Sequence, residues 1–215
     1  MPPLVNSKAR LAVELSKLDV FEEPDAGTEQ YPVDSEIGAD ALWNAYFLDD
    51  IEGMTIADLG CGTGLLGIGA LLLGAKKVYF VDSDENVLKA AKQNLSKFAD
   101  MGEAVFLHQD VNEFSEKAHA VIQNPPFGTK TKHADREFLV KAFSTARAVY
   151  SFHKATSKDF IEKLSGDNGF RVTHYWEHDF PIKASQLFHK RRIHRIKVGC
   201  WRMERTQEKL VEDDK

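Results

Sequence analysis

The sequence predicts an α/β fold in which a mostly parallel, seven-stranded sheet is covered by helices on both faces. Short β-rich runs alternate with helical patterns through most of the 215-residue chain, and this alternation is typical of βαβ units. The strand candidates are nearly continuous apolar runs, so both of their faces need covering. The last two strands have no helical pattern between them, so we expect the sheet to end with an antiparallel strand.

The first 54 residues contain two helices and a loop that we assign to the same domain as the sheet. Leucines at helical spacing predict a helix over residues 7–18. Glycine and prolines interrupt the pattern that follows. Periodicity resumes over residues 35–50, with Ser35 as the expected N-cap. We expect this second helix to pack against the sheet.

The core of the domain is expected over residues 55–203. Its β-rich runs are residues 54–60, 77–82, 104–110, 119–124, 149–153, 171–180 and 192–201. Helical patterns between them cover residues 65–73, 85–98, 136–148 and 157–164. The remaining residues, 204–215, form a highly charged tail that we expect to be frayed. The length suits one domain with short extensions.

Composition argues against several classes of protein. No apolar run is long enough to span a bilayer, and no hydrophobic segment follows the first positive charges, so we expect neither a membrane protein nor an ordinary secreted one. The two cysteines, Cys61 and Cys200, occur in a glycine-rich loop and an apolar strand pattern. They are interpreted as free thiols of a protein in the reducing cytoplasm.

Charge is distributed unevenly along the chain. The net charge of −5 argues against nonspecific coating of nucleic acid. Residues 183–203, however, carry seven Lys and Arg and no acid, with Lys190, Arg191 and Arg192 adjacent. This segment either meets an anionic partner or forms a solvated edge strand that resists aggregation. Charge alone favours neither interpretation.

A glycine-rich turn after the first strand is the first candidate binding site. Gly60, Gly62 and Gly64 stand between a strand and a helix, where glycine lets a ligand approach the backbone and the helix offers unpaired amides. Asp82 ends the next strand about 20 residues later, at the spacing of a carboxylate that binds a ribose diol. Together these features predict a nucleoside-containing cofactor, which leaves a dehydrogenase open as an alternative.

The end of the fourth strand carries the second candidate site, Asn124, Pro125, Pro126 and Phe127. Two prolines fix the backbone and remove two amide donors, so carbonyls remain as acceptors at the carboxyl edge of the sheet. The Asn124 side-chain oxygen and the Pro125 carbonyl would accept the two hydrogens of a planar amine and aim its lone pair at the cofactor. Phe127 would stack on the ring that carries this amine.

The turn DLGCGTG resembles the first motif of the class I methyltransferases, which bind S-adenosylmethionine in a Rossmann-like fold. The resemblance implies that Asp58 and Gly60 face the amino-acid end of the cofactor and that Asp82 holds the ribose. Asp110 and Val111 would lie beside the adenine. The other expected cofactor contacts are Gly62, Thr63, Gly64, Leu65 and Asn124. The Asn-Pro-Pro-Phe motif likewise resembles that of amino methyltransferases, which act on adenine, guanine or glutamine.

Three segments together resemble one group, the small archaeal and eukaryotic adenine N6-methyltransferases of small-subunit ribosomal RNA, of the methyltransferase-like protein 5 type. The segments are EQYP at 29–32, NPPFGTK at 124–130 and YSFHK at 150–154. The resemblance implies that Gln30 lies over the cofactor and that Tyr31 helps to close the site. The chain departs from the group at Val33, where a threonine is common, and at Thr63, where a cysteine sometimes occurs.

The resemblance also implies an RNA substrate and a partner. The residues expected at the RNA are Phe127, Lys130, Lys132, His133, Phe152, His153, Lys154, Lys190, Arg191 and Arg192. The base must be unpaired or extruded, because an adenine amino group inside a helix is paired and stacked. Members of the group form a heterodimer with a small zinc-containing activator protein, commonly by extending the sheet at its edge.

Other functions stay open at this stage. A protein-glutamine N5-methyltransferase shares the motif, although it usually carries a helical domain in front and tyrosine in place of Phe127. DNA methylation is disfavoured because a separate target-recognition domain is missing, although a partner could supply one. A non-catalytic ribosome-assembly factor that binds S-adenosylmethionine is the alternative outside the enzymes. We expect no metal site, since His174 and His178 are four apart in a strand pattern.

Overall fold

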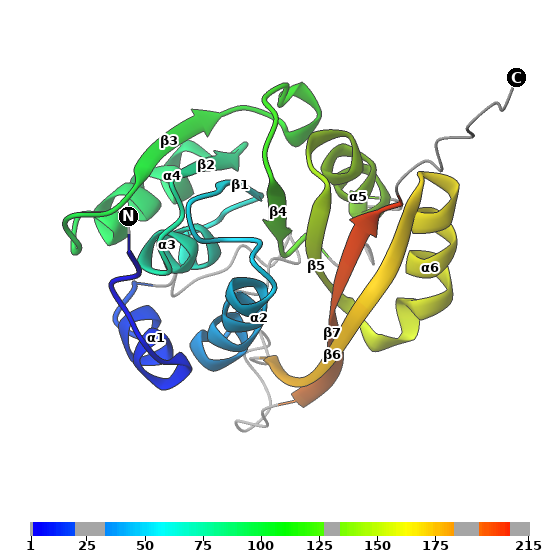
Figure 1. Cartoon of the computed structure of the whole chain (residues 1–215), viewed down its shortest axis with the longest axis horizontal. Helices are drawn as coiled ribbons and strands as arrows, with labels where there is room; N and C mark the ends of the chain where they lie inside the picture. Colours follow the sequence, from blue (N-terminus) through cyan, green and yellow to red (C-terminus); the bar gives the residue numbers. More distant parts are fainter. Residues whose placement is uncertain (1, 20–32, 127–133, 183–193, 207–215) are drawn as a thin grey trace, which may run out of the picture.

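The computed structural model describes residues 2–19, 33–126, 134–182 and 194–206. Its sheet has seven strands in the order β3-β2-β1-β4-β5-β7-β6, running across the molecule in Figure 1. The strands are Thr55–Leu59 (β1), Lys77–Asp82 (β2), Glu103–His108 (β3), Ala120–Gln123 (β4), Ala148–Lys154 (β5), Phe170–Ile182 (β6) and His194–Arg205 (β7). Neighbouring strands are parallel except at β7, which runs antiparallel to both β5 and β6. The predicted fold class is therefore confirmed.

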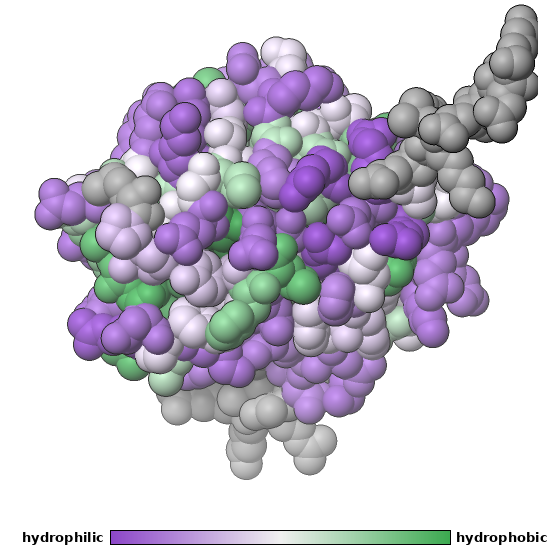
Figure 2. All heavy atoms as spheres, viewed as in Figure 1, coloured by the Kyte–Doolittle hydropathy of each residue, from purple (hydrophilic) through white to green (hydrophobic). Residues whose placement is uncertain are grey.

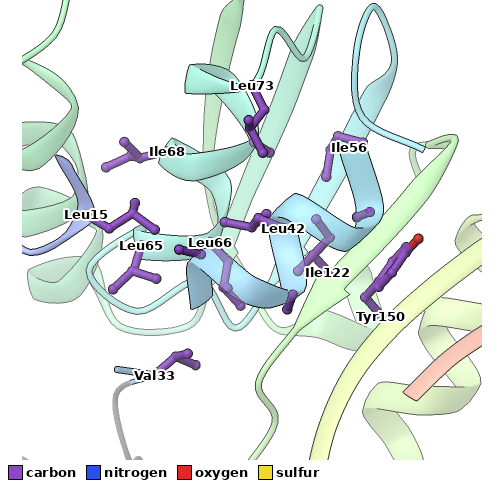
Figure 3. Close-up of a cluster of buried hydrophobic side chains, with 14 of the residues drawn as sticks. Leu15, Val33, Leu42, Ile56, Leu65, Leu66, Ile68, Leu73, Ile122 and Tyr150 are labelled. Atoms are coloured by element: carbon purple, nitrogen blue, oxygen red, sulfur yellow. The ribbon is translucent and has the colours of Figure 1, made fainter. Parts of the chain in front are cut away.

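Helices cover the sheet through two buried clusters, one on each face. They are Lys8–Leu15 (α1), Ser35–Phe47 (α2), Leu65–Leu72 (α3), Glu85–Leu95 (α4), Ala134–Thr145 (α5) and Lys158–Asp167 (α6), with short 3₁₀ helices at Val111–Glu113 (η1) and Ala155–Ser157 (η2). Successive strand residues alternate between the clusters, as Ile122 and Val121 do. Figure 3 shows the first cluster, where Leu42 and Leu66 lie near Ile122, and Leu15 lies near Leu65.

The described surface is mostly hydrophilic on the face seen in Figure 2, with smaller hydrophobic areas between. No helix of the described segments combines the length and the apolar character that a membrane crossing requires. Cys61 and Cys200 are both buried and free, as the sequence predicts.

Several element boundaries differ from the sequence prediction by a few residues. Asp34, rather than Ser35, caps α2, because its carboxylate accepts a hydrogen bond from the Glu36 amide at 2.9 Å. The helix expected over 136–148 ends at Thr145, because Ala148 already pairs in β5. The tail expected from residue 204 starts later, since β7 continues to Arg205, whose amide donates to the Arg147 carbonyl.

A buried polar cluster ties the segment after α2 to the antiparallel end of the sheet. The Tyr150 hydroxyl and the Arg202 Nε both donate to Oδ2 of Asp50, at 2.7 and 2.8 Å. Burial and the neighbouring Asp50 raise the pKa of Tyr150. These two hydrogen bonds satisfy Oδ2 of a carboxylate that is 1% exposed. Each of the three groups therefore depends on the other two for its buried position.

A glycine on α3 sets how closely this helix approaches the sheet. A Cβ at Gly67 would lie 2.3 Å from Cε1 of Phe80 in β2. We expect Gly67→Ala to lower the free energy of unfolding by about 1–3 kcal/mol through overpacking. At Gly166 in α6 a Cβ would meet nothing within 4 Å, so Gly166→Ala should raise it by up to about 1 kcal/mol. Urea unfolding measures the free energy of unfolding of both variants. Equal midpoints for the two would contradict the close packing of α3 against Phe80.

Candidate active site

The glycine turn joins β1 to α3 at the carboxyl edge of the sheet. Gly60, Gly62 and Gly64 have φ values of +67°, +53° and +87°, a region that glycine adopts without strain. The amides of Gly60 and Cys61 donate to the Val81 carbonyl of β2, which fixes the turn. A Cβ on Gly62 would meet nothing within 4 Å. The backbone of Gly62 is thus open to close approach by a ligand.

Asp82, at the end of β2, holds this turn in place. Its Oδ2 accepts from the Gly62 amide at 2.9 Å, and its Oδ1 accepts from the Asp84 amide at 3.0 Å. Burial raises the pKa of Asp82 against the effect of these two amides. Each carboxylate oxygen keeps a second lone pair, so Asp82 can still accept the hydroxyls of a ribose. Its position fits the predicted role.

Asp58 lies in β1 behind the turn and is 1% exposed. Its Oδ2 accepts from the Gly67 amide in the first turn of α3 at 2.8 Å. Burial raises the pKa of Asp58 to about 7, against the effect of this hydrogen bond. The carboxyl group therefore changes its charge near neutral pH, and its ionised form suits a cationic ligand.

The end of β3 supplies the third part of the predicted cofactor site. Asp110 is exposed and caps η1, with its side chain accepting from the Asn112 amide at 2.8 Å. Val111 is buried against the second cluster. Strands β3, β2 and β1 are adjacent and parallel, so their carboxyl ends meet at one edge of the sheet. Asp110 therefore lies at the same edge as Asp82 and the glycine turn.

The Asn-Pro-Pro motif begins beside the glycine turn. Gln123, the last residue of β4, is in register with Leu59, the last residue of β1. Asn124 and Gly60 are the next residues of these two parallel strands, so the two loops leave the sheet side by side. Pro125 is buried, whereas Asn124 is partly exposed. The structure therefore places the two predicted sites side by side at this edge of the sheet.

Several predicted site residues lie outside the described residues. They are Gln30, Tyr31, Phe127, Lys130, Lys132, His133, Lys190, Arg191 and Arg192. Val33, at the end of one such segment, is buried in the first cluster. Lys154 is described, and it ends β5 half-buried.

The structure corrects the prediction for Phe152 and His153. Both were expected at the RNA, but they are 0% and 2% exposed. β7 pairs with β5 at these positions, setting Phe152 opposite Cys200 and His153 opposite Gly199. His153 also packs edge-on against the ring of Trp201. These side chains therefore belong to the interior beneath the site, where they cannot touch a substrate.

Sequence reasoning missed two polar residues near the motif, Gln123 and Ser151. They are neighbours on β4 and β5, both 0% exposed, and the Gln123 Nε2 donates to the Ser151 Oγ at 3.0 Å. The available signal was a polar residue inside each apolar strand run. A strand end that carries polar side chains on its buried face is unusual, because an unpaired polar group is costly there.

The affinity for a cationic cofactor should depend on pH through Asp58. With its pKa at about 7, the ionised fraction rises about tenfold between pH 6 and pH 8. S-adenosylmethionine should therefore bind up to about tenfold more tightly at pH 8. Calorimetric titration at both pH values measures this. Asp58→Asn should remove the difference, and a pH-independent affinity of the unmodified chain would contradict the role of Asp58.

Two features define a class I S-adenosylmethionine-dependent methyltransferase. One is the strand order with its single reversed strand, and the other is the glycine turn that the Asp82 carboxylate holds in place. Magnesium protoporphyrin IX methyltransferase of Synechocystis, solved with S-adenosylmethionine bound, shares this fold at a TM-score of 0.61 and 18% identity, covering 94% of this chain and 98% of that one. Residues 35–150 match the methyltransferase small domain family. The chain belongs to that family.

Two relatives match nearly the whole chain. The rRNA N(6)-adenosine-methyltransferase METTL5 of Danio rerio is 36% identical, and the alignment covers 89% of this chain and 96% of the relative. A crystal structure of a Pyrococcus horikoshii protein, described there as a candidate RNA methyltransferase, is 42% identical with a TM-score of 0.85. It covers 94% of this chain and 100% of that one. These matches agree with the predicted family resemblance.

Proposed function

We propose that this chain transfers a methyl group from S-adenosylmethionine to the N6 atom of an adenosine in ribosomal RNA. One observation carries the proposal: the register of Leu59 with Gln123 starts the glycine turn and the Asn-Pro-Pro motif side by side. A methyl donor held by the first loop is then next to an amine held by the second. The name of the Danio rerio relative supports adenosine in ribosomal RNA as the substrate.

The residues of the chain act by holding and orienting the two reactants. The bound cofactor supplies an electrophilic methyl group. Asp82 accepts the ribose hydroxyls, and Asp58 in its ionised form offsets positive charge behind the turn. The Asn124 side chain and the Pro125 carbonyl accept the hydrogens of the adenine amine, which fixes the direction of the nitrogen lone pair. Positioning of this kind replaces the need for a strong general base.

The RNA is proposed to be that of the small ribosomal subunit, recognised as an unpaired or extruded nucleotide. Phe127 would stack on the flipped adenine and offset part of the unstacking energy. The basic residues of segments 130–133 and 190–192 would meet phosphates. They are Lys130, Lys132, His133, Lys190, Arg191 and Arg192. We further propose that the protein works in the cytoplasm, where its buried thiols stay reduced.

A small zinc-containing activator protein is the proposed partner, bound along the free edge of β3. This strand pairs only with β2 among the described strands, and four of its six residues are half-buried. A strand edge with unpaired amides and carbonyls accepts a further strand readily. Hydrogen exchange should show residues 103–108 protected on addition of the activator, whereas β6, at the opposite edge, should be unchanged. Protection of β6 instead would refute the edge of β3 as the binding surface for the activator.

The substrate is tested by separating the products of one labelling reaction. The chain, with and without activator, is incubated with methyl-labelled S-adenosylmethionine and small-subunit RNA, large-subunit RNA, transfer RNA, DNA and protein. We expect label in small-subunit RNA that digests to N6-methyladenosine. Label in glutamine of a protein would favour the glutamine methyltransferase instead. Label in large-subunit RNA alone would support the proposed methyl transfer but refute the small ribosomal subunit as the source of the substrate.

A further inference from the structure

A row of buried polar side chains lies beneath the Asn-Pro-Pro motif. Gln123, the residue before Asn124, donates from Nε2 to the Ser151 Oγ at 3.0 Å. The Ser151 Oγ lies 2.7 Å from Nε2 of His153. These three side chains are 0%, 0% and 2% exposed. They form a hydrogen-bonded relay that reaches from the interior of β5 to the last residue of β4.

The relay has a defined direction. The Ser151 hydroxyl accepts from Gln123 and has its single hydrogen available for His153, 2.7 Å away. We assign His153 Nε2 as the acceptor of that hydrogen, in a neutral imidazole whose own hydrogen is on Nδ1. Burial lowers the pKa of His153 to about 3 and keeps the ring neutral. The ring is held edge-on against Trp201, with centroids 5.9 Å apart at 67°.

The relay fixes the Gln123 carboxamide at the junction of the two loops. The backbone of Gln123 is in register with Leu59 on one side and Ser151 on the other. Its Oε1 is buried without a hydrogen-bond partner among the described residues. Val121 and Val149, one pleat earlier on the same face, are apolar and well packed. The core alone would accept apolar residues here, so its packing gives no reason for three polar ones.

We propose that Ser151 and His153 are positioning residues, which act through Gln123 to hold the strand end that presents Asn124 and Pro125 to the substrate. The proposal rests on the methyl transfer proposed above. Cutting the relay frees the Gln123 side chain and lets the start of the motif shift. A shift of this kind lowers the rate of transfer, whereas the glycine turn and Asp82 still bind the cofactor.

Removal of one hydroxyl tests the relay. Ser151→Ala should lower kcat for RNA methylation by about 10- to 100-fold, because a displacement near 1 Å can have that effect. The dissociation constant for S-adenosylmethionine should stay within about twofold. The matched control is Ser165→Ala in α6, which also removes a buried hydroxyl, one that donates to the Ile161 carbonyl at 2.7 Å. It should keep kcat. Ser151→Thr, which restores the hydroxyl, should recover most of the rate.

Equal kcat for Ser151→Ala and Ser165→Ala, at similar losses of thermal stability, would reduce the relay to ordinary core structure and overturn the proposal. A readout without turnover separates this result from failure of the proposed function. Nitrogen-15 NMR of the imidazoles should show His153 neutral, with Nε2 as a hydrogen-bond acceptor whose resonance shifts in Ser151→Ala. A protonated Nε2 would contradict the relay. If the chain methylates no RNA but shows this His153 resonance and its shift, only the proposed RNA substrate is refuted.

Discussion

Asn124→Ala should slow methyl transfer far more than it weakens binding of the cofactor. The side chain stands at the end of β4, one residue beyond the register of Gln123 with Leu59, where its oxygen can accept a hydrogen of the substrate amine. Without it the nitrogen lone pair is no longer aimed. We expect kcat to fall by at least about a hundredfold, the effect of removing one preorganised polar contact from a reacting centre.

The measurement combines single-turnover methylation of RNA with calorimetric titration of S-adenosylmethionine. Asn44→Ala is the matched control, because the Asn44 side chain donates within α2, to the Asp40 carbonyl at 2.8 Å, away from both loops. This control should keep its rate within about twofold. A rate for Asn124→Ala near that of the control would refute the role of Asn124. Loss of cofactor affinity in parallel would assign Asn124 to cofactor binding instead.

Asp82→Ala should remove most of the affinity for S-adenosylmethionine. The carboxylate supports the Gly62 amide and the Asp84 amide and remains able to accept both ribose hydroxyls. Hydrogen bonds to a charged group contribute about 1.5–3 kcal/mol each, so the loss of two predicts at least about a hundredfold weaker binding. Transfer at saturating cofactor should suffer much less, since Asp82 does not touch the amine.

Equilibrium binding of the cofactor measures this loss. Asp84→Ala is the control at a neighbouring carboxylate: Asp84 caps α4 by accepting from the Asn86 amide at 2.8 Å. Its loss should cost about 0.5–2 kcal/mol of stability and change cofactor affinity by less than about threefold. If both variants bound equally well, the ribose would have to be held by another group.

Much of the fold could be predicted because the signals are local. The apolar runs of β1, β2 and β4 identify buried parallel strands, and the glycine turn and Asp82 follow them at a set spacing. The parallel strands put the ends of β1 and β4 at one edge of the sheet. Both loops of the site could therefore be placed together before any side chain was seen.

Other features could not be predicted because they depend on partners far apart in the chain. The family resemblance suggested substrate contacts for Phe152 and His153, yet β5 becomes an interior strand when β7 pairs beside it, and both side chains are buried. Asp50 pairs with Arg202 at a separation of 152 residues. No local pattern reveals such a contact, since burial depends on which segment packs against a side chain.

The sequence by itself determined the chemistry of the two loops: glycines that let a ligand approach, a carboxylate for a ribose, and paired prolines that leave only acceptors. These properties belong to the residues and their immediate neighbours. Only the tertiary structure decided which polar groups support the loops. Gln123, Ser151 and His153 become one hydrogen-bonded row because the pairing of β4, β5 and β7 places all three in the interior, where buried polar groups hydrogen-bond to one another.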